Sequence, residues 1–204
     1  MNRFNFREVS VVVSQRLDMR GIVKEFPGVK ALDSADFQLE PGKVHALLGI
    51  NGAGKSTLIK ILSGVYQKDS GEIYLNGEKI EINSAQSAID KGIATVYQDP
   101  NMIPSFTGYE NIYLGFESEK KGLFPRINRK KLQQQAEDLL DRFSVEIDLT
   151  KPVSQLSAVE KETIAILRAL SRDMSVLVLD EPTSILTEKE TKILFDLIET
   201  LKAK

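Results

Sequence analysis

The stretch Gly49-Ile50-Asn51-Gly52-Ala53-Gly54-Lys55-Ser56 decides the fold of this chain. It fits the pattern G-x-x-x-x-G-K-[ST], in which glycines let backbone N–H groups wrap a chain of phosphates. A buried strand is predicted before it at 44–48, and residues 56–63 have the apolar spacing of a helix. A strand, a glycine turn and a helix N-terminus in that order place an anion at the positive end of the helix dipole. An incidental glycine turn would not combine all the fixed positions with this context.

Each residue type in this loop suits one part of a nucleoside triphosphate. Lys55 is expected to reach the β- and γ-phosphates, and the hydroxyl of Ser56 to bind Mg²⁺. The predicted nucleotide-binding residues of the loop are Gly49, Asn51, Gly52, Ala53, Gly54, Lys55, Ser56 and Thr57.

A second motif, Val176-Leu177-Val178-Leu179-Asp180-Glu181, ends an apolar strand with two carboxylates. Ligands bind at the carboxyl ends of strands in open α/β sheets. Asp180 suits a place just behind the direct ligands of Mg²⁺, and Glu181 can orient and polarise an attacking water. Alone, such a run is often a strand that meets a solvated loop. Together with the phosphate loop it indicates a P-loop nucleoside triphosphatase.

Composition bounds the chemistry further. The 204 residues hold no cysteine, which excludes disulfides and thiolate metal sites, and a single histidine, His45, which disfavours a histidine-built metal site. A net charge of −2 gives no long-range attraction to nucleic acid or to anionic lipid. No apolar run approaches the ~20 residues that span a bilayer. We expect His45 to be a residue of the strand before the phosphate loop, in the core or at its edge.

Strands and helices alternate along the chain, which predicts an α/β fold. The Asn76-Gly77 pair favours a type I′ hairpin turn, and Thr187 is a suitable N-cap. Residues 1–18 differ from the rest and are treated as an N-terminal extension; the run Val9–Val13 is interpreted as an added strand or a loose tail rather than a signal peptide. Strands are predicted at 37–39, 44–48, 71–75, 78–80, 93–97 and 176–179, and helices at 56–63, 84–91, 129–143, 157–171 and 188–201.

Residues between the two motifs give a family resemblance. Val96-Tyr97-Gln98 resembles the Q-loop of ABC ATPases, and Leu156-Ser157-Ala158-Val159-Glu160 stands where these proteins have LSGGQ. Asp180-Glu181-Pro182-Thr183-Ser184 resembles their extended Walker B motif. The segment 24–32 resembles their A-loop, with Phe26 at the place of the aromatic residue that stacks on adenine. The resemblance runs from about Met19 to the end of the chain.

The resemblance implies an α/β P-loop fold of the ABC nucleotide-binding type over residues 19–204. This fold would have a RecA-like core with a mainly parallel sheet, an antiparallel β portion, and a helical subdomain at about 99–172. Gln98 would sense Mg²⁺ and the γ-phosphate, and Ser157 would contact ATP held by a second nucleotide-binding domain across an ATP-sandwich dimer. Phe26 would stack on the adenine. From the residues alone, Gln98 is a polar loop residue, Ser157 a helix N-cap and Phe26 core filler.

The residues at 26–33, 64–67, 92–98 and 110–115 are similar to those of the ATPases in importers of ribose-, galactose- and xylose-type monosaccharides. Their ATPases carry two fused nucleotide-binding domains, and this chain resembles the first. Ala158 and Val159 replace two glycines of the LSGGQ pattern, which restricts close approach to a phosphate.

The implied function is Mg²⁺-assisted ATP hydrolysis that drives sugar uptake through a membrane permease, with the segment after Gln98 facing that permease. An extracytoplasmic sugar-binding protein would deliver the sugar, the chain would lie peripherally at the cytoplasmic face of the membrane, and no nucleic acid is implied. Three alternatives stay open at this point: a nucleoside importer ATPase, a soluble ABC protein that acts on ribosomes or DNA, and a non-catalytic nucleotide-binding fragment.

The end of the chain leads to one more expectation. In the family a switch histidine lies on the strand that follows the helix predicted at 188–201, and the sequence ends at Lys204. By analogy that strand would lie between the strands at 44–48 and 176–180. We therefore expect a gap at the centre of the sheet, poor ATP hydrolysis by this chain, and lower stability than that of a longer form.

Overall fold

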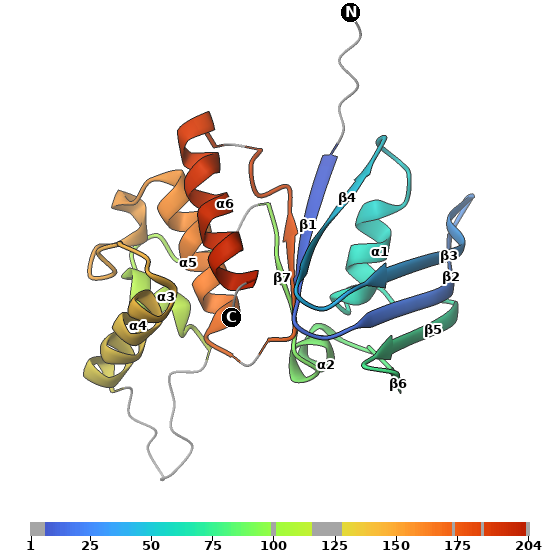
Figure 1. The fold of residues 1–204 in the computed structure, drawn as a ribbon, viewed down its shortest axis with the longest axis horizontal. Coiled ribbons are helices and arrows are strands. Elements are labelled where there is room, and N and C mark those ends of the chain that lie inside the picture. The colour runs from blue at the N-terminus through green and yellow to red at the C-terminus, as the bar shows by residue number, and fades with distance from the viewer. Residues whose placement is uncertain (1–6, 99–100, 116–127, 173, 185, 203–204) are drawn as a thin grey trace, which may run out of the picture. The chain divides into compact units, whose positions relative to one another are not determined.

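The computed structural model describes residues 7–98, 101–115, 128–172, 174–184 and 186–202 (Figure 1). The chain divides into two compact units. The first comprises Met1–Gln98, Asp173–Pro182 and Lys202–Lys204, and the second comprises Asp99–Arg172 and Thr183–Leu201.

One sheet of the first unit carries the two sequence motifs. Its strand order is β4-β1-β8-β7, with β4 at Lys43–Gly49, β1 at Arg7–Val13, β8 at Val176–Asp180 and β7 at Ile93–Val96. Strands β7 and β8 are parallel, whereas β1 is antiparallel to both β4 and β8. Strands β4, β8 and β7 therefore run in one direction, as expected for the core, and β1 runs against them.

Our expectation of an open gap at the centre of this sheet is wrong, because β1 lies there. It pairs with β4 from Arg7↔Gly49 to Val13↔Lys43, and with β8 from Val9↔Asp180 to Val13↔Val176. The physical reason is that unpaired N–H and C=O groups on buried strands are costly, and a segment rich in β-branched valine can satisfy them. Of the two expectations for Val9–Val13, the added strand is the one observed.

The second sheet of this unit is the antiparallel portion, with strand order β3-β2-β5-β6. The turn between β5 and β6 has positive φ at both Asn76 (51°) and Gly77 (82°), as the predicted type I′ geometry requires. The strands are β2 (Leu17–Phe26), β3 (Val29–Leu39), β5 (Ser70–Leu75) and β6 (Glu78–Ile80), and every pairing between them is antiparallel.

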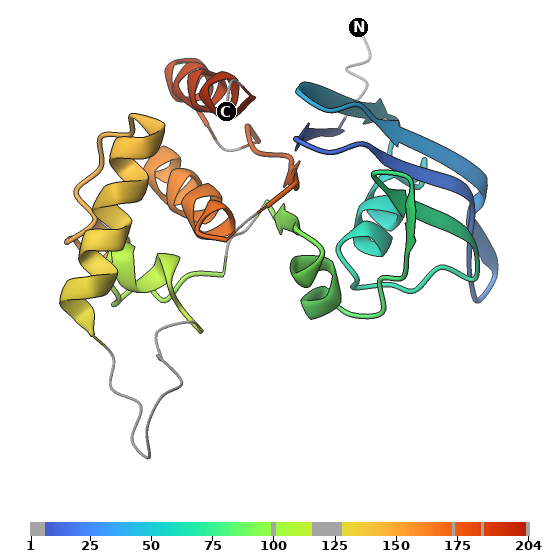
Figure 2. The same cartoon turned by 60° about the horizontal axis from the view of Figure 1, so that its bottom comes forward.

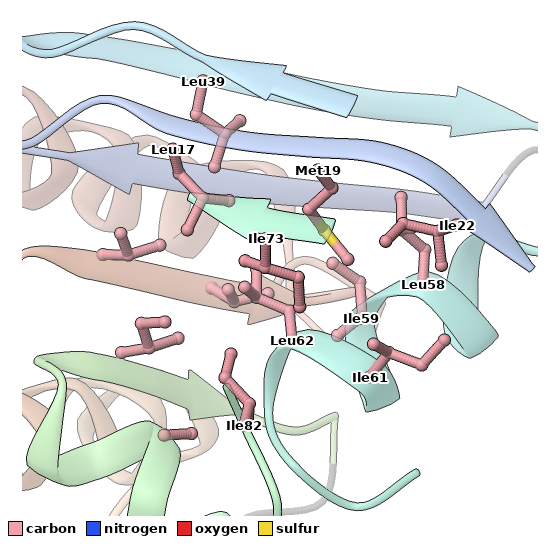
Figure 3. Packing of buried hydrophobic residues seen from close by; sticks show 14 of the residues in the cluster. Leu17, Met19, Ile22, Leu39, Leu58, Ile59, Ile61, Leu62, Ile73 and Ile82 are labelled. Atoms are coloured by element: carbon pink, nitrogen blue, oxygen red, sulfur yellow. The ribbon is translucent and has the colours of Figure 1, made fainter. Parts of the chain in front are cut away.

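Helix α1 (Lys55–Leu62) packs its apolar face against this second sheet (Figures 1 and 2). Leu17 and Met19 of β2 and Ile73 of β5 point toward Ile59 and Leu62 of α1, and all five are at most 1% exposed (Figure 3). The short helix α2 (Ala85–Asp90) lies between β6 and β7 in the chain and begins with a capping box at Ser84. The core of the first unit thus fixes the helix that follows the phosphate loop.

The second unit is helical. It contains α3 (Gly108–Ile112), α4 (Arg129–Phe143), the 3₁₀ turn Val153–Gln155, α5 (Ala158–Leu170) and most of α6 (Glu188–Lys202). Helices α4, α5 and α6 lie where the sequence predicts them. Helix α3 was not predicted, since five residues hold too little periodicity to detect.

Within this unit, Asn111 fixes the segment before α3. It is 1% exposed, its Oδ1 accepts a hydrogen bond from the Ile103 N–H at 2.8 Å, and its amide donates to the carbonyls of Ile103, Phe106 and Thr107.

No helix among the described residues is long and apolar enough to cross a bilayer.

Candidate nucleotide-binding site

The phosphate loop follows β4 and leads into α1. Gly52 and Gly54 have φ values of +83° and +84°, a left-handed conformation that favours glycine. A Cβ at Gly54 would lie 2.7 Å from the carbonyl oxygen of Ala31 and from Cδ2 of Leu32. Gly54 is also the N-cap of α1 and makes no side-chain cap. The glycine pattern thus lets the loop turn tightly against β3 and leaves the first turn of α1 open to an anion.

Lys55 places a positive charge at the phosphate loop. Its side chain is only 8% exposed, and its Nζ donates hydrogen bonds to the carbonyl oxygens of Gly49 at 2.6 Å and Ile50 at 2.9 Å. The ammonium is thus held over the loop by neutral acceptors and has no carboxylate among these partners. A poorly hydrated cation in this setting interacts strongly with a phosphate oxygen.

A single pocket joins the phosphate loop to the β2–β3 hairpin. It has a volume of about 540 Å³, within the range of roughly 300–1,000 Å³ that ligand pockets occupy. The pocket is lined by Phe26, Val29, Lys30, Ala31, Asn51, Gly52, Ala53, Gly54, Lys55, Ser56 and Thr57. The sequence missed Val29, Lys30 and Ala31 as lining residues. Their proximity follows from the return of β3 beside Phe26, which the interpretation of Phe26 as an A-loop residue could have suggested.

Phe26 provides the aromatic wall of this pocket. Its ring makes an edge-to-face contact with Tyr66, with centroids 5.3 Å apart and an interplanar angle of 68°. The Nζ of Lys24 lies 5.5 Å from the centre of the Phe26 ring. These contacts hold a half-buried ring at the pocket wall, and aromatic faces bind planar bases by stacking. An aromatic wall and an ammonium with a helix N-terminus in one pocket suit the two chemically different parts of a nucleotide.

The second sequence motif, residues 176–181, ends at the edge of the first sheet where the phosphate loop begins. Because β7 and β8 are parallel and pair Val96 with Leu179, Asp180 ends β8 beside the end of β7, which Gln98 closely follows. The register of β1 places Gly49 opposite Arg7 and Asp180 opposite Val9, so β4 also ends at this edge. The fold thus gathers the start of the phosphate loop, Gln98 and the Asp180–Glu181 pair at one sheet edge, as predicted for strand carboxyl ends.

Glu181 has a conformation that the sequence did not reveal. Its φ is +53°, in the left-handed region, although it is not glycine. Such a conformation costs an L-residue roughly 1–2 kcal/mol. Backbone strain of this kind is concentrated at functional sites, where the surrounding structure holds it in place.

The oxygen donors predicted for Mg²⁺ are chemically consistent with that ion. Ser56 offers a hydroxyl, Gln98 an amide carbonyl and Asp180 a carboxylate, which are the hard ligands that Mg²⁺ prefers. Among the described residues there is no group of three or more His, Cys, Asp or Glu side chains that could hold a metal ion.

Ser157 belongs to the second unit, where it is the N-cap of α5. Its backbone N–H and its hydroxyl both donate to Oε2 of Glu160, at 2.8 and 2.7 Å, and the Glu160 N–H donates back to Oγ at 3.3 Å. The hydrogen bond from the Ser157 N–H, followed by that from its hydroxyl, lowers the pKa of the Glu160 carboxyl. The N-cap interpretation is confirmed, and the γ-phosphate role of Ser157 stays a prediction.

His45 has the structural role expected of it. It lies in β4, and its Nε2 accepts a hydrogen bond from the Glu40 N–H at 2.9 Å, across the turn that leads into the strand.

The fold and this pocket define a P-loop nucleotide-binding domain. The sequence profile of the ABC transporter family matches residues 32–184, and the chain belongs to that family. Over 186 residues it is 46% identical to the "Ribose import ATP-binding protein RbsA 1" of Rubrobacter xylanophilus, a match that covers 91% of this chain and 37% of that protein. It is 45% identical to the "Putative ribose/galactose/methyl galactoside import ATP-binding protein 2" of Burkholderia lata, covering 91% of this chain and 35% of that protein.

Solved structures share the fold. A nucleotide-free ATP-binding cassette from an ABC transporter superposes with a TM-score of 0.77 at 24% identity, covering 93% of this chain and 78% of that one. The cbiO1 protein of Clostridium perfringens, part of the ABC transporter complex cbiONQ, gives a TM-score of 0.74 at 24% identity and covers 92% and 73% of the two chains. The chain spans about a third of the length of the curated relatives named above.

Proposed function

We propose that this chain is an ATP-binding and ATP-hydrolysing portion of an importer ATPase that energises the uptake of a monosaccharide. The observation that carries the proposal is the single pocket in which Phe26 and the phosphate loop face one ligand volume. The choice of a monosaccharide rests on the relatives, whose printed names specify ribose and galactose import.

In the proposed reaction, water attacks the γ-phosphorus of ATP and ADP leaves. Lys55 and the open first turn of α1 would hold the phosphate charge, and Phe26 would stack on the base. The Glu181 carboxylate would accept a hydrogen bond from the attacking water and orient it. Ser56, Gln98 and Asp180 would hold Mg²⁺, which neutralises charge that develops on the phosphate oxygens.

The partners are proposed on the same basis. Membrane permease subunits would change conformation in response to ATP binding by this domain. An extracytoplasmic sugar-binding protein would supply the sugar to them. Ser157, at the N-terminus of α5, would contact ATP bound to a second nucleotide-binding domain. The chain would then act peripherally at the cytoplasmic face of the membrane.

The proposal is tested by measuring Mg-ATP binding by calorimetry on the chain and its variants, and phosphate release on the same variants in a form extended to the length of the curated relatives. Lys55→Ala should weaken ATP binding by about 1.5–3 kcal/mol, the scale of a charged hydrogen bond. Glu181→Gln should keep ATP binding and lower phosphate release, because it retains size and removes the carboxylate. Lys60→Ala is the matched control, since Lys60 lies on the same helix with its Nζ 5.3 Å from the centre of the Tyr66 ring, and it does not line the pocket.

Equal ATP affinity in the Lys55→Ala and Lys60→Ala variants would contradict the assignment of the pocket. Unchanged phosphate release in Glu181→Gln would show that another group orients the water.

A further inference from the structure

Strand β1 is the one described strand that joins β4 to the rest of its sheet. The order β4-β1-β8-β7 gives β4 no other neighbour in that sheet, and β1 pairs with it over all seven of its residues (Figure 1). The phosphate loop starts at the end of β4, and Asp180 ends β8. Within this sheet the two halves of the nucleotide site are therefore connected through β1.

Strands β4 and β8 both depend on β1 for backbone hydrogen bonds along the edges that face it. Residues Val176–Leu179 of β8 are at most 4% exposed, so water does not reach them freely. These exposures hold with β1 in place; if β1 left, the N–H and C=O groups that β8 turns toward it would lose their hydrogen bonds, which is unfavourable. The inner edges of β4 (Lys43–Gly49) and β8 (Val176–Asp180) thus form a strand slot that requires an occupant.

Strand β1 is not next in the chain to either of the strands that it pairs with. It is followed by β2, which belongs to the second sheet. Residues 7–13 lie outside the 32–184 region that matches the family, and residues 14–16 alone connect them to β2. This connection is held in place: the Ser14 N–H donates to the Ser175 carbonyl at 2.8 Å, and the Asn76 N–H donates to the Arg16 carbonyl at 2.8 Å. The run Val11-Val12-Val13 has high strand propensity, so it suits a slot that binds backbone from both sides.

We propose that residues 7–13 act as a built-in donor strand, and that occupation of the strand slot by an antiparallel, valine-rich strand controls ATP binding. The register supports the coupling, because the same end of β1 lies opposite both Gly49 and Asp180. With the slot filled, the phosphate loop and the strand end at Asp180 are held at a fixed separation. With the slot empty, β4 loses its partner in this sheet, and the site loses that constraint. The coupling to ATP rests on the proposed function, whereas the strand exchange does not.

Cysteine pairs test the register directly, since the chain has no cysteine of its own. Ser10 lies opposite Ala46 and Glu8 opposite Leu48, with Ala46 and Leu48 exposed on β4. Directly opposed residues are close enough for a disulfide, whereas pairs displaced by two residues lie about 7–8 Å apart. The variants Ser10→Cys/Ala46→Cys and Glu8→Cys/Leu48→Cys should form intramolecular disulfides quickly on mild oxidation. The mismatched controls Ser10→Cys/Leu48→Cys and Glu8→Cys/Ala46→Cys should form them slowly.

A proline at the centre of the strand tests the coupling to ATP. Val11→Pro removes a backbone N–H donor, and the control Val11→Thr keeps both that donor and a β-branched side chain. If the slot is then filled in about a tenth of the molecules, the apparent Kd for Mg-ATP rises about tenfold. A synthetic peptide of residues 5–14 should restore the affinity of the Val11→Pro variant, and a scrambled peptide should not.

Three results would overturn the inference: equal disulfide rates in matched and mismatched pairs, disulfides that link two chains, and equal ATP affinity in Val11→Pro and Val11→Thr. Disulfides between chains would mean that the strand comes from a second copy. If the unsubstituted chain binds no ATP, the proposed function fails, and the disulfide pattern still decides whether β1 fills the slot.

Discussion

At the scale of single residues, Gly54 shows how one side chain would disturb the site. Its φ of +84° is unfavourable for any other residue, and a Cβ would lie 2.7 Å from the backbone oxygen of Ala31. We expect Gly54→Ala to destabilise the chain and to weaken ATP binding by about 1–3 kcal/mol, because the loop must shift away from β3. Thermal melting and calorimetric titration of Mg-ATP measure the two effects.

Gly77 provides a matched control for this prediction. Its φ of +82° is nearly the same, and a Cβ there meets nothing within 4 Å. Gly77→Ala should cost only the roughly 1–2 kcal/mol of the left-handed conformation, with ATP affinity unchanged. Equal effects of the two substitutions on ATP binding would show that close approach to β3 does not shape the loop.

A buried carboxyl makes stability depend on pH. Glu162 in α5 is 6% exposed, and burial raises the pKa of its carboxyl from the ordinary 4.5 to about 7. The folded chain therefore binds this proton more tightly than the unfolded chain, and its stability falls as the pH rises from 4.5 through 7. Glu162→Gln should stabilise the chain by up to ~3 kcal/mol at about pH 8, with the gain fading toward about pH 4.

Urea unfolding across this pH range measures the difference between the two proteins. The exposed Glu146 gives the control substitution Glu146→Gln, for which a small and pH-independent change is expected. A gain in Glu162→Gln that stays constant with pH would contradict the role of ionisation.

At the scale of helices, the capping box of α5 has a structural and a proposed functional task. Ser157→Ala removes the acceptor for the Glu160 N–H and should lower the free energy of unfolding by about 1 kcal/mol. Ser157→Asn should cost less, because asparagine is also a good N-cap. Urea unfolding of the three proteins checks this order, and equal losses in the two variants would show that the side chain does not cap α5.

The sequence predicts these helices well because their signals are local. Thr187 illustrates this, since its backbone N–H and hydroxyl both donate to Glu190, at 2.9 and 2.7 Å, at the start of the predicted helix α6. The phosphate loop is predictable for the same reason, as its glycines, Lys55 and Ser56 occupy fixed spacings in one short segment. Local pattern is enough where the structure is determined by neighbours in the chain.

Long-range pairing is what the sequence could not supply. Strand β1 is paired with residues 43–49 and 176–180, and nothing in residues 7–13 themselves indicates these partners or the antiparallel direction. The left-handed φ of Glu181 is likewise imposed by its surroundings, since glutamate has no preference for it.

At the scale of the whole molecule, the location of the pocket predicts where ATP stabilises the chain. Every residue that lines it belongs to the first unit, as do Gln98, Asp180 and Glu181. A ligand at 100 times its Kd adds about 2.7 kcal/mol to the stability of whatever must be folded to bind it. We expect Mg-ATP to slow amide hydrogen exchange in β4, α1 and β8 strongly, and in α3 and α4 weakly.

Hydrogen exchange with mass spectrometry, with and without Mg-ATP, measures this distribution peptide by peptide. The Lys55→Ala variant serves as the control, because at the same ATP concentration it should show much less protection in every segment. Strong protection confined to the first unit would mean that the helical unit opens independently of the nucleotide in this chain. Equal protection of α3, α4 and α1 would contradict the prediction, since it requires that opening of the helical unit also disrupts the pocket. The binding free energy would then stabilise both units as one cooperative structure.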